Sequence, residues 1–176
     1  MTGGGPIIVT ALLRAEDFAW LNGLRLAHYP PDRNRVPAHL TLFRHLPPSL
    51  AGELDRRLKA ETGEDAPAAS LAGPELLDHG VALRVRSEGL EALRERLEDA
   101  FVGLLTPQDA GGWRPHVTIQ NKAAPAAARA LHAVLLRERW PRPLILSGLA
   151  SWRYREGSWE PIRRHRFSRS GRSPRN

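Results

Sequence analysis

The sequence predicts an α+β fold of two similar lobes, and two observations lead to that prediction. Two short segments, residues 39–42 and 116–119, share the order His, apolar, Thr, apolar. Each lies in a predicted strand that is followed by a predicted helix and two further strands, in residues 38–86 and again in 114–167. Such a duplication favours two antiparallel sheets that form a central groove, related by an approximate twofold axis, with helices packed outside.

The first half of the chain alternates strands and helices. Apolar and β-branched residues predict strands, and apolar positions at helical spacing predict helices. Ser49 follows two prolines and precedes an apolar helical pattern, so we expect it to be the N-cap of the second helix. The predicted elements are a strand over 7–13, a helix over 15–28, the first motif strand over 38–46 and a helix that ends before Gly63.

The second half repeats this order. Ser87 is expected to cap a helix whose apolar residues trace one face, with an Arg94–Glu98 ion pair on the other face. Pro125 is expected to open an alanine-rich helix. The predicted strands are 68–77, 80–86, the second motif strand 114–121, 143–154 and 158–167.

Composition limits the class of protein. The 176 residues are 41% apolar, which is enough for one domain, and we assign that domain to residues 1–167. No apolar run is long enough to span a membrane, and no secretory signal is visible at the N-terminus. The chain has no cysteine, which excludes disulfides and thiolate catalysis. We therefore expect a soluble, cytoplasmic monomer.

The net charge of +7 is concentrated near the C-terminus. Six arginines and no acidic residue lie between 163 and 176, so the rest of the chain carries only 7 − 6 = +1. Residues 168–176 have few apolar side chains, and we expect them to form a disordered basic tail. This tail could contact phosphates, but a solvated terminus is the simpler interpretation.

The two motifs place chemistry on one face of each strand. Side chains of a strand alternate between its faces, so His39 and Thr41 point one way, as do His116 and Thr118. The alternative is that these are ordinary half-buried strands whose polar faces carry His and Thr, and the duplication argues against it. One site built from two half-sites is the better hypothesis.

Two imidazoles in one groove suit a reaction that needs a base and an acid near neutral pH. Two hydroxyl groups beside them can donate hydrogen bonds to the oxygens of a bound phosphate. The motifs hold no carboxylate, cysteine or activated serine, which argues against nucleophilic acyl transfer. Displacement at a phosphate ester fits, and it requires neither a metal nor a cofactor.

The residues of these segments resemble a known family. Residues 37–43 read Pro-Ala-His-Leu-Thr-Leu-Phe, and residues 113–119 read Trp-Arg-Pro-His-Val-Thr-Ile. Together with the element order they resemble the two-histidine (2H) phosphoesterases, in the LigT-like branch of bacterial 2′-5′ RNA ligases and RNA 2′,3′-cyclic phosphodiesterases. The resemblance implies a LigT-like fold and hydrolysis of 2′,3′-cyclic phosphates on RNA ends or cyclic nucleotides. It makes His39 and His116 catalytic, and Thr41 and Thr118 phosphate-binding.

Other residues are candidates for contacts with the substrate. By strand alternation Phe43 shares the face of His39 and could stack on a base, although packing at the groove edge explains it equally well. Lys122 shares the face of His116 and could neutralise a phosphate, unless it is a solvated strand end. Five further residues could line the cleft, although packing in the core explains most of the aromatic ones equally well: Arg114, Trp113, Tyr29, Trp152 and Tyr154.

Two further functions remain open from the sequence. The same site could act as a 2′-5′ RNA ligase or hydrolyse 2′-5′ linkages. A protein of another class, which binds RNA ends without turnover and takes affinity from its arginine tail, is also possible. The sequence does not distinguish the general base from the general acid.

Overall fold

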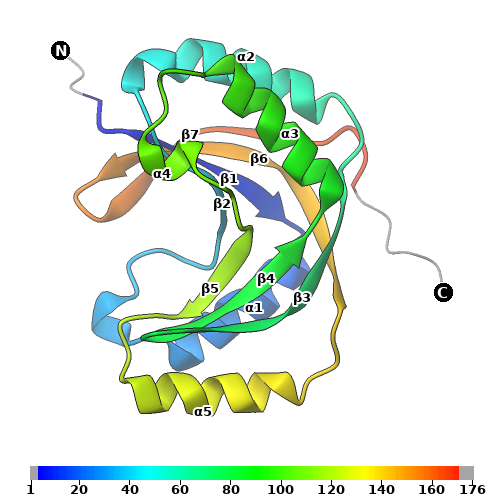
Figure 1. The fold of residues 1–176 in the computed structure, drawn as a ribbon. Helices are drawn as coiled ribbons and strands as arrows, with labels where there is room; N and C mark the ends of the chain where they lie inside the picture. The colour runs from blue at the N-terminus through cyan, green and yellow to red at the C-terminus, as the bar shows by residue number, and fades with distance from the viewer. Residues whose placement is uncertain (1–3, 171–176) are drawn as a thin grey trace.

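The computed structural model describes residues 4–170, and its seven strands join into one antiparallel sheet (Figure 1). The strands pair in the order β2-β1-β6-β3-β4-β5, and β7 pairs with β6. Their bounds are β1 Ile7–Leu13, β2 Leu40–Leu46, β3 Ala68–Leu77, β4 Gly80–Arg86, β5 His116–Gln120, β6 Arg142–Arg155 and β7 Ser158–Arg166.

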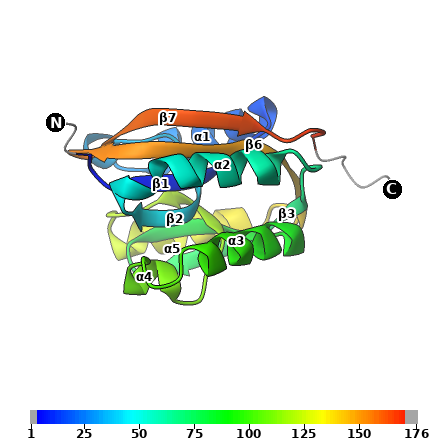
Figure 2. The same cartoon turned by 90° about the horizontal axis from the view of Figure 1, so that it is seen from above.

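Five α-helices surround the sheet, and two short 3₁₀ turns, Pro31–Arg33 and Pro48–Leu50, precede β2 and α2. Figures 1 and 2 show α2 and α3 on one side of the curved sheet and α1 and α5 toward the other. None of the described helices is long and apolar enough to cross a membrane. The helices are α1 Ala15–His28, α2 Ala51–Thr62, α3 Glu88–Ala100, α4 Pro107–Ala110 and α5 Pro125–Leu136.

The long strand β6 joins the two halves of the molecule. Its first residues pair with β3, where Ile145 lies opposite Ala68, and the remainder pairs with β1, where Arg153 lies opposite Ile7. The sequence predicts two sheets, whereas the structure has one hydrogen-bonded sheet that is continuous through β6. The α+β class and its antiparallel strands agree with the prediction. The sheet curves until two of its edge strands, β2 and β5, contact each other.

One hydrophobic core runs through both halves. It contains residues of both motif strands, such as Leu42 of β2 and Val117 of β5, together with the apolar faces of the helices. Helix α5 packs on β3 and β4, and α2 packs on β6 and β7. Helix α1 crosses to the other half of the chain and packs on β5. The two motif strands are thus held by a shared interior.

Most predicted elements have the bounds that their patterns indicate, and the differences are local. Ser87 is an N-cap as expected, because its hydroxyl accepts a hydrogen bond from the backbone N–H of Leu90 at 3.1 Å. Ser49 is not one, because a 3₁₀ turn over Pro48–Leu50 runs directly into α2 and makes Leu50 the N-cap. Arg94 and Glu98 do pair at 2.8 Å, but Arg94 is only 3% exposed and points inward.

Four of the six arginines near the C-terminus lie within the described residues. Arg163, Arg164 and Arg166 are exposed on β7. The backbone N–H of Ser168 donates to the carbonyl of Thr62 at 2.9 Å. The carbonyl of Arg169 accepts the backbone N–H of Ala66, just before β3, at 2.9 Å. The start of the expected tail therefore contacts the loop after α2. Residues 171–176 lie outside the described residues.

A β-bulge interrupts β2 directly after the first motif. Thr41 lies opposite Thr10, and the next pair joins Phe43 to Val9, so Leu42 is the extra residue. The alternation of faces breaks at this point, and Leu42 and Phe43 are both buried, at 1% and 0% exposure.

The second motif strand has the equivalent bulge. Thr118 lies opposite Ala82, and Gln120 lies opposite Val81, which makes Ile119 the extra residue. Ile119 and Gln120 are both buried, at 0% and 5% exposure. The duplication seen in the sequence therefore extends to the backbone irregularity that follows each Thr.

Candidate active site

A cleft of about 530 Å³ lies between the two motif strands. His39 and Thr41 line it from the start of β2, and His116 and Thr118 line it from β5. The structure thus brings together the four motif residues, which come from positions 77 residues apart in the chain.

Both imidazoles are oriented by the same backbone contact. Nδ1 of His39 lies 2.8 Å from the carbonyl oxygen of Pro37, and Nδ1 of His116 lies 2.8 Å from that of Arg114. A carbonyl oxygen can only accept a hydrogen bond, so Nδ1 must carry the proton in each ring. Nε2 is then the nitrogen that each histidine offers to a ligand.

The surroundings of His39 favour its neutral form. Burial lowers the pKa of His39 to about 4, and the charges of Arg25 and Arg44 act in the same direction, whereas the hydrogen bond to Pro37 opposes them. The ring of Trp159 covers the imidazole, with 4.5 Å between the ring centroids and 60° between the planes. Burial and these charges therefore favour the neutral imidazole of His39.

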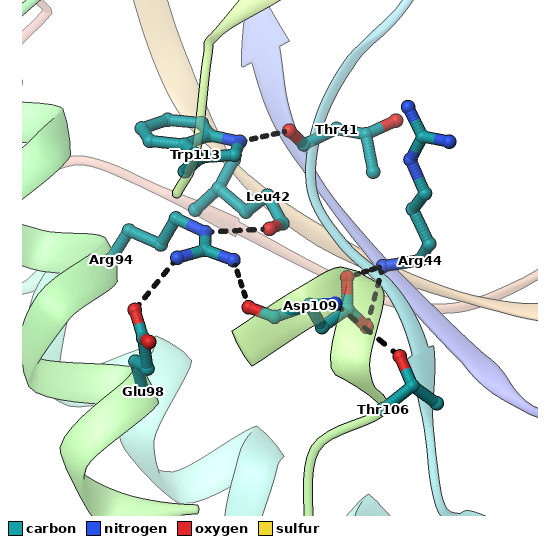
Figure 3. A network of polar contacts seen from close by, with 8 residues as sticks. All are labelled: Thr41, Leu42, Arg44, Arg94, Glu98, Thr106, Asp109 and Trp113. Atoms are coloured by element: carbon teal, nitrogen blue, oxygen red, sulfur yellow. Dashed lines mark hydrogen bonds and ion pairs between the residues drawn. The ribbon is translucent and has the colours of Figure 1, made fainter. Parts of the chain in front are cut away.

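Side chains from the second half of the chain hold the backbone of β2 (Figure 3). Nε1 of Trp113 donates to the carbonyl of Thr41 at 3.0 Å, and Nε of Arg94 donates to the carbonyl of Leu42 at 2.8 Å. Because β2 is an edge strand, no further strand is available to fix this segment. The two contacts secure the motif at the residues where the bulge begins.

Asp109 of α4 continues this network. Its carboxylate accepts the backbone N–H groups of Arg44 and His45, both at 2.9 Å for the nearer oxygen. Asp109 is only 3% exposed, and Thr106 caps its short helix by accepting the N–H of Asp109 at 3.3 Å. The loop before the second motif is thereby attached to the strand of the first.

The predicted substrate contacts are placed differently from one another. Arg114, Trp113 and Tyr154 line the cleft, whereas Tyr29 and Trp152 are not among its lining residues. The guanidinium of Arg114 pairs with Glu75 at 2.9 Å. Phe43 is wrong as a base-stacking residue, because the bulge turns it into the core, 4.5 Å beneath the guanidinium of Arg94. Lys122 is not part of the cleft lining, since it follows the second bulge and has a left-handed backbone conformation, with φ of 58°.

Sequence reasoning missed several residues that line the cleft, and Arg44 and Trp159 are two of them. Strict alternation from Thr41 places Arg44 on the opposite face, and only the bulge brings it to the cleft. Trp159 comes from β7, where it lies opposite Tyr154 of β6. No local motif marks it, because its position depends on long-range strand pairing.

The described residues offer no evident metal site. Within residues 4–170, no group of three or more His, Asp or Glu side chains is arranged to hold an ion. The polar groups that line the cleft include imidazole, hydroxyl and guanidinium groups, which suit an anionic substrate, together with the Gln108 amide and the Asp109 carboxylate.

Comparison with known families gives the same assignment as the geometry of the motifs. The sequence model of the 2′-5′ RNA ligase superfamily matches residues 13–158, which is most of the chain. The chain belongs to this superfamily. Its function is accordingly of the two-histidine phosphoesterase or 2′-5′ RNA ligase-like kind. No sequence match to a curated protein was found.

Solved structures with the same fold cover nearly the whole chain. The protein TT0787 of Thermus thermophilus is 18% identical with a TM-score of 0.62, covering 93% of this chain and 98% of that one. E. coli LigT complexed with 3′-AMP is 19% identical with a TM-score of 0.54, covering 94% and 99%. E. coli LigT complexed with NADP⁺ is 18% identical with a TM-score of 0.55, and the match covers 94% of this chain and 99% of that one. At these identities the likeness establishes the fold.

Proposed function

We propose that this member of the superfamily is a phosphodiesterase that opens 2′,3′-cyclic phosphates on RNA ends or nucleotides. The observation that carries the proposal is the pair of imidazoles, each with Nδ1 held by a backbone carbonyl and each beside a Thr, in one cleft. The complex of E. coli LigT with 3′-AMP supports a nucleotide ligand for the shared fold. Residues 4–170 of this chain offer the reaction its own acid and base, without a metal site.

In this scheme His39 is the general base and His116 the general acid, since burial favours the unprotonated Nε2 of His39. Nε2 of the neutral His39 takes a proton from water as the water oxygen forms a bond to phosphorus. The bond from phosphorus to one ribose oxygen breaks, and that oxygen takes a proton from Nε2 of His116, which enters this step as the imidazolium with both ring nitrogens protonated. The product is a phosphomonoester, and the two histidines return to their starting forms by exchanging protons with solvent.

The remaining cleft groups stabilise charge on the phosphate. The hydroxyls of Thr41 and Thr118 donate hydrogen bonds to its non-bridging oxygens, one from each half-site. The guanidinium groups of Arg44 and Arg114 add positive charge at the cleft wall.

The direct test is turnover of the four 2′,3′-cyclic nucleotides in excess EDTA. We expect the wild-type protein to open the ring, and we expect His39→Gln and His116→Gln each to lower kcat by at least about 100-fold, since each removes a general acid or base. His28→Gln changes an exposed histidine at the end of α1 and is the matched control. Unchanged turnover in either cleft variant would contradict the assigned role.

The superfamily name favours one second candidate, which is 2′-5′ ligation or hydrolysis of 2′-5′ linkages at the same site. Here a 5′-hydroxyl of RNA takes the place of water as nucleophile, and the same histidines transfer the protons. Incubation of RNA halves that carry a 2′,3′-cyclic phosphate and a 5′-hydroxyl separates the two reactions by their products. Binding of RNA ends without turnover in either assay would instead identify a non-catalytic binding protein.

A further inference from the structure

We propose that Arg25 and Arg94 are reciprocal positioning residues that fix the two half-sites relative to each other. Each arginine lies on the helix that precedes one motif, α1 or α3, and reaches the strand that carries the other motif. The kinetic part of this proposal rests on the proposed function, whereas the structural part stands independently of it.

Arg94 spans the loop before the second motif and the strand of the first. Its Nε donates to the carbonyl of Leu42 at 2.8 Å, and one terminal nitrogen donates to the carbonyl of Asp109 at 2.6 Å (Figure 3). The other terminal nitrogen pairs with Glu98 at 2.8 Å. The planar guanidinium lies 4.5 Å from the ring of Phe43, so its orientation is fixed by packing as well as by hydrogen bonds.

Arg25 makes the corresponding connection in the opposite direction. Its Nε donates to the side-chain oxygen of Asn34, in the loop before the first motif, at 2.8 Å. One terminal nitrogen donates to the carbonyl of Thr118 in the second motif at 3.0 Å. The guanidinium lies 4.2 Å from the ring of Tyr29. Each arginine therefore joins the approach to its own motif with the strand of the other.

The two acceptor carbonyls lie at neighbouring, not identical, places in the repeat. Thr118 is the last residue before the second bulge, and Leu42 is the extra residue of the first bulge. The contacts thus differ by one position along the motif. Both hydrogen bonds are made at the bulge, where the regular pairing of the strand is interrupted and the motif side chains change face.

Burial makes these contacts strong constraints. Both arginines are only 3% exposed, and burial lowers the pKa of each side chain below its usual value. A buried guanidinium must keep its hydrogen-bond partners, because leaving them unpaired carries a large desolvation cost. Movement of one half-site relative to the other would break these bonds, and the geometry of the cleft is held accordingly.

The two residues differ in their compensating charge. Arg94 has Glu98, whereas Arg25 has neutral oxygens and an aromatic ring, and within residues 4–170 no carboxylate lies within ion-pair distance of it. The positive charge of Arg25 contributes to the low pKa of His39.

The test uses four variants: Arg25→Met, Arg25→Lys, Arg94→Met and Arg94→Lys. A lysine keeps the positive charge at either position, and at position 94 it can still pair with Glu98, which helps to preserve the fold. Its single nitrogen does not span two separate acceptors as the guanidinium does. Arg96→Met on α3 is the matched control, since that arginine pairs with Glu61 at the surface at 2.7 Å. Arg57→Met on α2 is a second surface control.

We expect kcat on 2′,3′-cyclic nucleotides to fall about 10- to 100-fold in the methionine and lysine variants alike, with KM changed less than about threefold. The surface controls should keep wild-type values. Recovery of kcat by lysine, or an equal loss in the Arg96→Met control, would overturn the proposal.

A second measurement does not depend on turnover. Imidazole ¹⁵N shifts of His39 and His116 are followed as inorganic phosphate is added to each folded variant. We expect phosphate to shift both Nε2 signals together in the wild type and in the surface controls, and only one of them in the Arg25 and Arg94 variants. Joint shifts in all variants would overturn the positioning role even if kcat fell, whereas a split response without any turnover would sustain it and contradict the proposed function alone.

Discussion

At the scale of single residues, the two catalytic candidates are chemically unequal although their motifs match. His39 is covered by Trp159 and lies near two arginines, and its pKa of about 4 follows from that burial and charge. His116 has the same tether from Nδ1 to a carbonyl but no such aromatic cover among the described ring contacts. A duplicated motif can thus divide the roles of base and acid through its surroundings.

We expect Trp159→Leu to raise the pKa of His39 from about 4 toward its usual value, because water then reaches the imidazole. As His39 acts neutral, the acidic limb of kcat/KM should move to higher pH together with this pKa. Titration of the imidazole protons by NMR measures the first effect, and distant histidines such as His79 serve as internal controls. A shift of the alkaline limb instead would make His39 the acid.

At the scale of elements, the edge strand β2 takes its conformation from side chains rather than from another strand. Trp113, Arg94 and Asp109 all come from the second half of the chain and bind the backbone of β2. The bulge needs such support, because it removes regular pairing with β1 next to the motif.

Removal of the Asp109 carboxylate should destabilise the fold through this strand. Asp109→Ala leaves the backbone N–H groups of Arg44 and His45 without their acceptor, and we expect the free energy of unfolding to fall by about 1–3 kcal/mol. Urea denaturation measures the change. Asp99→Ala, at an exposed position of α3, is the control, and its free energy of unfolding should stay within about 0.5 kcal/mol of the wild-type value. An equal loss of stability in both variants would contradict the role of the Asp109 carboxylate in holding β2.

The sequence predicted the elements and the four motif residues because local patterns determine them. Apolar spacing and Ser87 set the bounds of α3, and the repeated His-x-Thr identified both half-sites. Alternation failed where a bulge follows each Thr, and this failure explains both the error for Phe43 and the missed Arg44. A bulge depends on the partner strand, so a single strand's sequence does not reveal it.

Arg94 shows a second limit of sequence reasoning. An Arg and a Glu four positions apart on a helix are typical of an exposed ion pair, which is what the pattern predicts. The pair exists, but the helix packs so that Arg94 is buried against β2. The side of a helix that faces the core is decided by long-range packing, and the same holds for Trp159, which reaches the cleft through the pairing of β6 with β7.

At the scale of the whole molecule, the two halves of the chain depend on each other. Strand β6 pairs with strands of both halves, α1 packs on β5, and one core cluster includes both motif strands. A molecule connected in this way is expected to unfold cooperatively as one unit. Protonation of a group buried in the cleft should therefore change the free energy of unfolding of the entire molecule.

We expect the free energy of unfolding to rise with pH between about 4 and 6.5, owing to His39. In this range the unfolded chain binds a proton at its ordinary imidazole while the folded protein keeps His39 neutral, so the slope is up to about 1.4 kcal/mol per pH unit. Urea denaturation at several pH values measures the slope. His39→Gln should reduce it, and an equal slope in that variant would show that His39 is not its source.

The side chains that hold β2 also have a consequence for how the protein meets other molecules. Exposed backbone groups on a sheet edge invite pairing with a strand of another chain, which leads to aggregation. Here Trp113, Arg94 and Asp109 occupy hydrogen-bonding groups of the edge at Thr41, Leu42 and the residues after them. The edge strand beside the cleft therefore offers fewer free backbone groups for pairing with a strand of a second copy.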